Sequence, residues 1–123
     1  MGNIQHFEDL QAWQKSYELV LAIYRFTALF PVEERFGLTQ QLRRAAVSVP
    51  SNIAEGWGRQ SRPDFLRFLQ IARGSVYEVR TQLKLSIDLG YATQIESPLG
   101  LVGDVDRLLN ALIRSLREKP RSN

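Results

Sequence analysis

Arginine supplies most of the side chains in this chain that could recognise a charged ligand. Between Arg35 and Lys84 the sequence has nine basic residues against three acidic ones, and eight of the nine are arginine. A guanidinium group can bind a phosphate or a carboxylate through two parallel hydrogen bonds, so this segment is suited to a nucleic-acid backbone. The same charges also fit a solvated surface held by intramolecular ion pairs, and the sequence leaves both interpretations open.

Seven residues in this segment are the predicted contacts to nucleic acid. Six are cations that would neutralise phosphates, and one is an aromatic ring on which a base could stack. Little base specificity is expected, because arginines on a helix surface contact phosphates more often than base edges. The cations are Arg43, Arg59, Arg62, Arg73, Arg80 and Lys84, and the aromatic residue is Tyr77.

Residues that could support catalysis are few. The chain has no cysteine, and its one histidine, His6, lies near the N-terminus without partners that would position it. Glu55 and Glu78 could face each other as an acid–base pair, but ion pairs with neighbouring arginines explain them better. The sequence has neither paired Glu-x-x-His motifs nor a glycine-rich loop after a strand. We therefore predict no catalytic residue, no metal, no cofactor and a protein that is not an enzyme.

A row of hydrogen-bonding side chains follows one side of the second expected helix. Gln41, Ser48, Asn52 and Glu55 recur at helical spacing beside the apolar stripe. We expect them to form a structural polar network between helices, since buried polar groups need partners. A ligand groove at the same place is the alternative, and the sequence does not decide between the two.

Four apolar-periodic segments, separated by glycine and proline, must position these side chains. We expect four helices, over about residues 7–30, 38–58, 63–89 and 97–118. The short joins predict an all-α fold, an antiparallel up-and-down four-helix bundle that forms a single domain over residues 1–123, with a disordered tail at 119–123. Pro50 lies inside the second segment, where the apolar pattern continues in phase, so we expect one helix with a proline kink rather than two abutting helices.

The first and third helices are expected to carry more apolar surface than one core needs. In the first helix the expected core stripe includes Tyr17, Leu21 and Tyr24, and a second apolar edge lies beside it. The third helix has an apolar strip apart from its own core stripe. Surplus patches of this kind usually mark interfaces, so we predict a homo-oligomer. The predicted interface residues are Val20, Ile23, Phe26, Ile71, Leu85 and Leu89.

The N-terminal sequence and the apolar runs carry no membrane signal. MGNIQHFEDLQAW has neither a basic region nor an apolar run, so we expect no signal peptide. The longest apolar run, from Leu19 to Tyr24, is too short to span a bilayer. We therefore expect a cytoplasmic protein that does not contact membranes.

Two motifs in the middle of the chain resemble a known family. They are LTQQLRRAAVSVPSNIAEGWGR at residues 38–59 and FLRFLQIARGSVYEVRTQL at residues 65–83. Their unusual combinations, SVPSNIAEG and IARGS, occur in the order found in the four-helix-bundle family of ribosomal-RNA intervening-sequence proteins. The accessory proteins of diversity-generating retroelements are similar to that family. The resemblance covers roughly residues 7–91.

This resemblance implies a small up-and-down bundle that assembles into a homo-oligomeric ring, usually a pentamer, without a catalytic residue. It suggests nucleic acid or a reverse transcriptase as the partner. We therefore predict a non-catalytic homo-oligomer that binds the backbone of RNA or DNA through an arginine-rich surface. The alternative is a structural adaptor that binds a protein partner, such as a reverse transcriptase, and never contacts nucleic acid.

Overall fold

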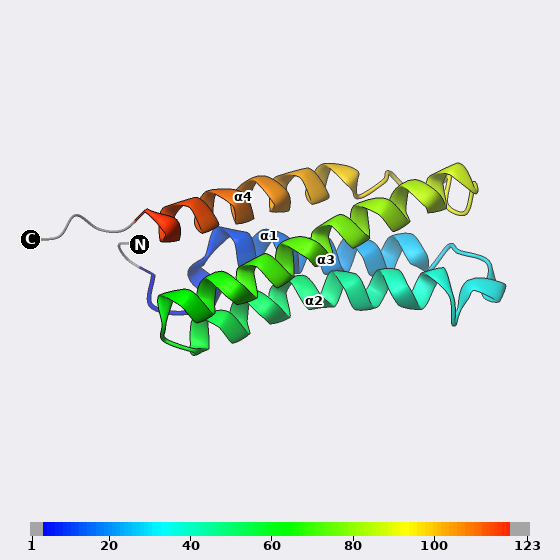
Figure 1. Ribbon diagram of the computed structural model, residues 1–123. Helices are drawn as coiled ribbons and strands as arrows, with labels where there is room; N and C mark the ends of the chain where they lie inside the picture. Colours follow the sequence, from blue (N-terminus) through cyan, green and yellow to red (C-terminus); the bar gives the residue numbers. More distant parts are fainter. Residues whose placement is uncertain (1–3, 119–123) are drawn as a thin grey trace, which may run out of the picture.

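Four long helices and two short 3₁₀ turns make up the described part of the chain (Figure 1). The structure is a computed structural model and describes residues 4–118. The predicted disordered tail at 119–123 lies outside the described residues. In chain order the elements are η1 (Phe7–Asp9), α1 (Gln11–Thr27), η2 (Val32–Glu34), α2 (Leu38–Gly58), α3 (Arg62–Asp88) and α4 (Leu99–Arg117).

Each helix packs against two others, in the closed order α1, α2, α3, α4. The diagonal pairs α1–α3 and α2–α4 have no Cα atoms within 8 Å of each other in the described part of the chain. This is the arrangement of a four-helix bundle, and it confirms the predicted all-α fold class. Between residues 4 and 118, no helix is both long and apolar enough to cross a membrane.

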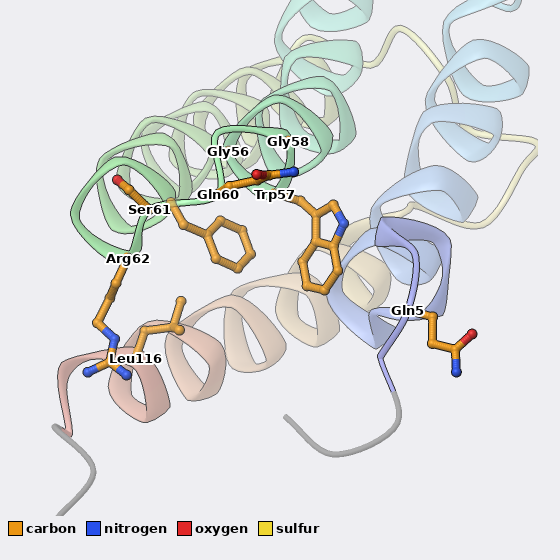
Figure 2. A pocket seen from close by; sticks show the side chains of 9 residues that line it. Gln5, Gly56, Trp57, Gly58, Gln60, Ser61, Arg62 and Leu116 are labelled. Carbon is orange, nitrogen blue, oxygen red and sulfur yellow. The ribbon is translucent and has the colours of Figure 1, made fainter. Parts of the chain in front are cut away.

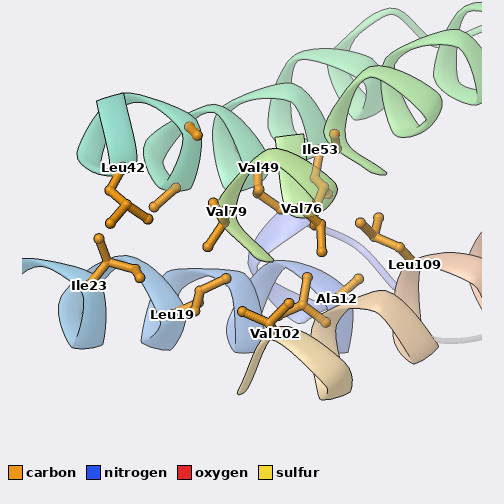
Figure 3. Close-up of a cluster of buried hydrophobic side chains, with 14 of the residues drawn as sticks. Ala12, Leu19, Ile23, Leu42, Val49, Ile53, Val76, Val79, Val102 and Leu109 are labelled. Carbon is orange, nitrogen blue, oxygen red and sulfur yellow. The ribbon is translucent and has the colours of Figure 1, made fainter. Parts of the chain in front are cut away.

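The core lies along the axis of the bundle, where apolar side chains from all four helices meet (Figure 3). Burying a leucine, isoleucine or phenylalanine stabilises the fold by about 1.5–3 kcal/mol relative to leaving it exposed. The core therefore supplies most of the free energy that holds the helices together. Its largest fully buried side chains include Phe26, Leu19, Ile23, Leu42, Ile53, Leu69, Leu83, Leu109 and Ile113.

The buried face of α1 differs from the predicted one. Three expected core residues, Tyr17, Leu21 and Tyr24, are 50%, 45% and 43% exposed. Ile23 and Phe26, predicted at an oligomer interface, are 0% and 1% exposed because they point into the core of their own chain. The prediction of these two residues as interface residues is therefore wrong.

Two hydroxyl side chains explain why the apolar spacing misplaces this face. Ser16 and Thr27 lie on the buried side of α1, at 0% and 2% exposure. The Ser16 hydroxyl donates to the Trp13 carbonyl at 2.8 Å, and the Thr27 hydroxyl donates to the Ile23 carbonyl at 2.7 Å. Hydroxyls satisfied within their own helix can be buried at little cost. Two polar residues therefore lie on the inner face of α1, so polarity alone does not separate its inner face from its outer face.

The other predicted interface residues lie nearer the surface. Val20 is partly buried against the core. Ile71, Leu85 and Leu89 of α3 are 43%, 50% and 51% exposed. Their part in an interface stays a prediction.

The helix ends and Pro50 refine the expected boundaries. The first helical segment is divided, because Leu10 adopts an extended conformation between η1 and α1. Helix α2, by contrast, continues as one helix with Pro50 buried inside it. One helix is therefore the correct alternative at this point, and the kink itself stays a prediction.

Gly56 permits a close approach of α2 and α3. It is buried near the end of α2, where an added Cβ would lie 2.7 Å from the Cβ of Phe68 and 3.0 Å from Cδ1 of Phe65. The Cβ of Phe68 is fixed to the α3 backbone and cannot swing aside. Any larger residue would therefore push the two helices apart.

We expect Gly56→Ala to destabilise the bundle by about 1–3 kcal/mol, because the added methyl group overpacks this crossing. Gly74→Ala is the matched control. Gly74 is exposed in α3 with open space where a Cβ would lie, so alanine there should stabilise the protein by up to about 1 kcal/mol. Urea unfolding followed by circular dichroism measures both variants. Equal free energies of unfolding would contradict the role given to Gly56.

Candidate nucleic-acid interface

Arg73 and Arg80, two of the predicted nucleic-acid contacts, lie on α3 and are bonded to side chains of α4. Arg73 Nη1 donates to Asn110 Oδ1 at 2.9 Å, and Arg80 Nη2 lies 3.6 Å from Asp106 Oδ2. Asn110 Nδ2 donates in turn to Asp106 Oδ1 at 3.0 Å, so the four side chains form one chain of polar contacts. Arg73 and Arg80 therefore join the two helices, and their availability to phosphates is reduced.

Tyr77 and Lys84 stay exposed on α3. The Tyr77 side chain is 43% exposed, and the guanidinium carbon of Arg80 lies 5.9 Å from its ring centre. Lys84 has no acidic side chain within 4.0 Å in the described part of the chain. This face thus offers one cation without an ionic partner and one aromatic ring.

Glu55 does not belong to the polar network predicted for it. Its carboxylate is exposed and accepts a hydrogen bond from Arg59 Nε at 3.2 Å, one turn along α2. The guanidinium carbon of Arg59 also lies 5.0 Å from the ring centre of Phe68. An exposed pair of this kind contributes only about 0.3–0.5 kcal/mol. Arg59 therefore has an ionic partner on its own helix, and that ion pair is weak.

The remaining members of the polar row connect α2 to α3. Asn52 Nδ2 donates to the Ser48 carbonyl at 2.8 Å and to Ser48 Oγ at 2.9 Å. The Ser75 hydroxyl of α3 donates to the same Ser48 Oγ at 2.9 Å. Gln82 Nε2 reaches Gln41 Oε1 at a longer 3.4 Å. A structural polar network between helices requires contacts of this kind. The shortest of them are centred on Ser48.

Arg43 is held against the C-terminal end of α1. Its Nε donates to Thr27 Oγ1 at 2.8 Å, and its Nη2 donates to the Tyr24 carbonyl at 3.4 Å. Its guanidinium carbon lies 4.5 Å from the ring centre of Tyr24. A cation is favourable both at a helix C-terminus and over an aromatic ring. Arg43 is therefore fixed in position.

A groove of about 530 Å³ opens beside Arg43, between α1, α2 and the turn that follows η2. Arg35 and Arg44 line it together with Arg43, and the rings of Tyr24 and Phe36 form apolar parts of its wall. No acidic side chain lines the groove in the described part of the chain. Arginines combined with aromatic rings are the side chains that bind phosphates and stack bases.

Sequence reasoning identified Arg43, assigned Tyr24 to the core instead, and missed Arg35, Phe36 and Arg44. Arg44 follows Arg43 directly, and nothing in its spacing distinguishes it from the other cations of the segment. Arg35 and Phe36 lie in the connection between the first two helices, whose path no periodic pattern predicts. One sequence feature could have indicated this part of the groove. Phe36 is a large aromatic residue between an arginine and a glycine, in a connecting segment where polar residues are usual.

Glu34 fixes the turn that carries Arg35 and Phe36. Its Oε1 accepts the backbone N–H of Leu38 at 3.0 Å, and its Oε2 accepts the Tyr91 hydroxyl at 2.7 Å. The hydrogen bond from Leu38, followed by that from Tyr91, lowers the pKa of Glu34 below its ordinary value. Donation to Glu34 likewise raises the pKa of Tyr91, with burial and the Glu34 charge acting in the same direction.

A second depression, of about 480 Å³, lies at the opposite end of α2 (Figure 2). Trp57, Phe65 and Leu116 contribute its apolar lining, and the Trp57 and Phe65 rings pack edge to face with centres 5.9 Å apart. Arg62 is its one basic lining residue among those described, so this predicted contact does not line the groove that contains Arg43. Residues 4–118 contain no group of three His, Cys, Asp or Glu side chains placed to hold a metal ion.

Comparisons with known proteins confirm the predicted family resemblance. The family model described as 23S rRNA-intervening sequence protein matches residues 8–111. Among solved structures, the chain is similar to a protein of unknown function from the S23 ribosomal protein family of Bacteroides thetaiotaomicron VPI-5482, with 28% sequence identity and a TM-score of 0.72. That similarity covers 84% of this chain and 95% of the other. No curated protein matches the chain.

The Glu34–Tyr91 pair predicts a pH-dependent stability. A carboxyl group whose pKa is lowered by folding stabilises the protein above its ordinary pKa of 4.5, and this contribution is lost as the pH falls below that value. A phenol whose pKa is raised stabilises below its ordinary pKa of 10.0, and this contribution is lost as the pH rises further. Tyr91→Phe should therefore lower the melting temperature most between about pH 5.5 and pH 9.

Thermal unfolding of wild type and variant across this pH range measures the effect. Tyr77→Phe, on the exposed face of α3, is the control and should leave the melting temperature unchanged. A Tyr91→Phe effect of the same size in acid and at neutral pH would contradict an ionised Glu34 as the acceptor.

Proposed function

Because the chain belongs to the family of 23S rRNA-intervening sequence proteins, we propose that it is a non-catalytic helical bundle that binds the backbone of RNA or DNA through arginine side chains. The observation that supports this most directly is the groove between α1 and α2, which Arg35, Arg43 and Arg44 line together with two aromatic rings. The lining contains no carboxylate and no histidine among the described residues, which supports binding rather than acid–base catalysis.

Charge and access favour this groove over the outer face of α3. Arg35 and Arg44 are exposed, and no acidic side chain lies within 4.0 Å of them in the described part of the chain. Arg73 and Arg80 are bonded to Asn110 and Asp106 instead. The Asp106 carboxylate already offsets part of the Arg80 charge, and the bond to Asn110 holds the Arg73 guanidinium against α4. The groove is therefore the better phosphate site.

We also propose that copies of the chain assemble into a ring, of five subunits as the family resemblance implies. Exposed apolar residues on two helices support assembly: Tyr17 and Leu21 on α1, and Leu85 and Leu89 near the end of α3 with Ile71 further along the same helix. Helices α1 and α3 are diagonal in the bundle, so the two sets of residues lie on different sides, as a heterologous contact that closes into a ring requires. Assembly would repeat the groove around the ring and multiply its charge.

The double variant Arg35→Gln with Arg44→Gln should weaken binding to all RNA and DNA sequences alike. For every phosphate that the variant no longer neutralises, the log–log salt slope should become shallower by about 0.9 for a duplex or about 0.7 for a single strand. Arg114→Gln with Arg117→Gln is the matched control, because these exposed arginines lie at the C-terminal end of α4. The control removes the same charge and should leave the slope nearly unchanged. Fluorescence anisotropy over a salt series measures both.

Two results would contradict the proposal. An equal decrease of affinity in the two double variants would mean that net charge alone drives binding. Wild type that binds neither RNA nor DNA at low salt would favour the alternative function, an adaptor that contacts only a protein partner.

Light scattering of the wild-type protein should give a mass several times the 14.1 kDa of one chain. Leu85→Lys should lower that mass, because a buried lysine in an apolar contact costs desolvation energy. Gln70→Lys, at an exposed polar position of the same helix, should leave it unchanged. A wild-type mass near 14.1 kDa would contradict assembly, and a stable dimer would contradict the ring alone.

A further inference from the structure

We infer that the groove binds an unpaired nucleotide, with its base against the Phe36 ring and its neighbouring phosphates on Arg35 and Arg44. This inference rests on the proposed function and goes further, because it names the form of nucleic acid that the groove accepts. Bases in a duplex are stacked on one another, whereas an unpaired base in a single strand, loop or bulge offers an open face.

Phe36 leaves most of its surface exposed to solvent. Its side chain is 81% exposed, more than any other large hydrophobic residue between positions 4 and 118. Apolar surface left in water is unfavourable, and a lone aromatic ring at a groove edge is suited to stacking. The guanidinium carbon of Arg35 lies 5.9 Å from the ring centre, at the outer limit of a cation–π contact. The ring is therefore open to a planar ligand.

The turn that presents Phe36 is already held in place. The backbone N–H of Gly37 donates to the Glu34 carbonyl at 3.0 Å, and that of Leu38 donates to the Glu34 carboxylate at 3.0 Å. A Cβ at Gly37 would lie 2.7 Å from Glu34 Oε1, so glycine makes room for that carboxylate. Tyr91 holds the other carboxylate oxygen at 2.7 Å. A turn whose backbone is fixed beforehand loses little conformational entropy when a base binds to the ring that it carries.

Another part of the groove wall is equally ordered. The guanidinium of Arg43 lies 4.5 Å from the Tyr24 ring centre, and its Nε donates to Thr27 at 2.8 Å. Guanidinium planes stack on bases as aromatic rings do. Arg44 and Arg35 add exposed cations to the same groove. Stacking surfaces and phosphate donors therefore share one depression of about 530 Å³, which is within the range of small-ligand sites.

Peptide ligands match this combination less well. An acidic peptide could pair with the arginines, but its carboxylates would leave the Phe36 ring uncovered. An apolar peptide could cover the ring, but it would bury the guanidinium groups of Arg35 and Arg44 without counter-charges, which is costly. A nucleotide supplies both a planar base and an anionic phosphate.

The test compares a labelled oligouridine single strand with a labelled RNA duplex of the same length, by fluorescence anisotropy at one fixed salt concentration. Wild type should bind the single strand more tightly. Phe36→Ala should weaken single-strand binding by about 5- to 150-fold, the decrease expected when one base no longer stacks, and should leave duplex binding unchanged. Phe36→Trp keeps an aromatic face and should retain the preference for the single strand.

Val32→Ala is the matched control, because Val32 is 69% exposed on the neighbouring turn η2 but does not line the groove. It should change neither affinity. Wild type that binds neither probe at low salt would overturn the proposed function together with this inference. Equal affinity for the two probes, or a Phe36→Ala variant that weakens both alike, would overturn the inference alone and leave phosphate binding in place.

Discussion

The close contact between α2 and α3 is the constraint on which the rest of the bundle depends. Near the end of α2, Gly56 lets two phenylalanines of α3 approach the α2 backbone. In the middle of the pair, the hydroxyls of Ser48 and Ser75 meet at 2.9 Å. These contacts set the register of the two helices, so the start of α2 and the end of α3 lie at the same end of the bundle (Figure 1). Glu34, which precedes α2, can then accept the hydroxyl of Tyr91, which follows α3.

In that arrangement some arginines connect one helix to another, and others are exposed at the surface. Arg43 joins α2 to the end of α1, whereas Arg73 and Arg80 join α3 to α4. Arg35 and Arg44 have no ionic partner in the described part of the chain and line the same groove. The proposed function depends on this division rather than on the number of charges, because a phosphate can reach Arg35 and Arg44 without displacing an ionic partner within the chain.

Local spacing was enough to predict the all-α bundle, because the type and order of helices follow from apolar periodicity and from glycine and proline positions. The buried face of α1 could not be predicted in this way, since Ser16 and Thr27 bond to their own helix and still look polar in the sequence. The bond from Arg73 to Asn110 joins residues 37 positions apart, which no local pattern reports. Of the predicted nucleic-acid contacts, only Arg43 lines the groove. Phe36 could not be predicted, because its exposure depends on the path of a turn.

Whether nucleic acid lies in the groove between α1 and α2 is tested most directly by photo-cross-linking. Thiouridine-substituted RNA would be irradiated with the wild-type protein, and the linked peptides would be identified by mass spectrometry. Cross-links are expected at Tyr24 and Phe36, because both rings line the groove and stack readily on bases. Cross-links confined to Tyr77 would put the nucleic acid on the outer face of α3 instead, and would contradict the groove as the binding site.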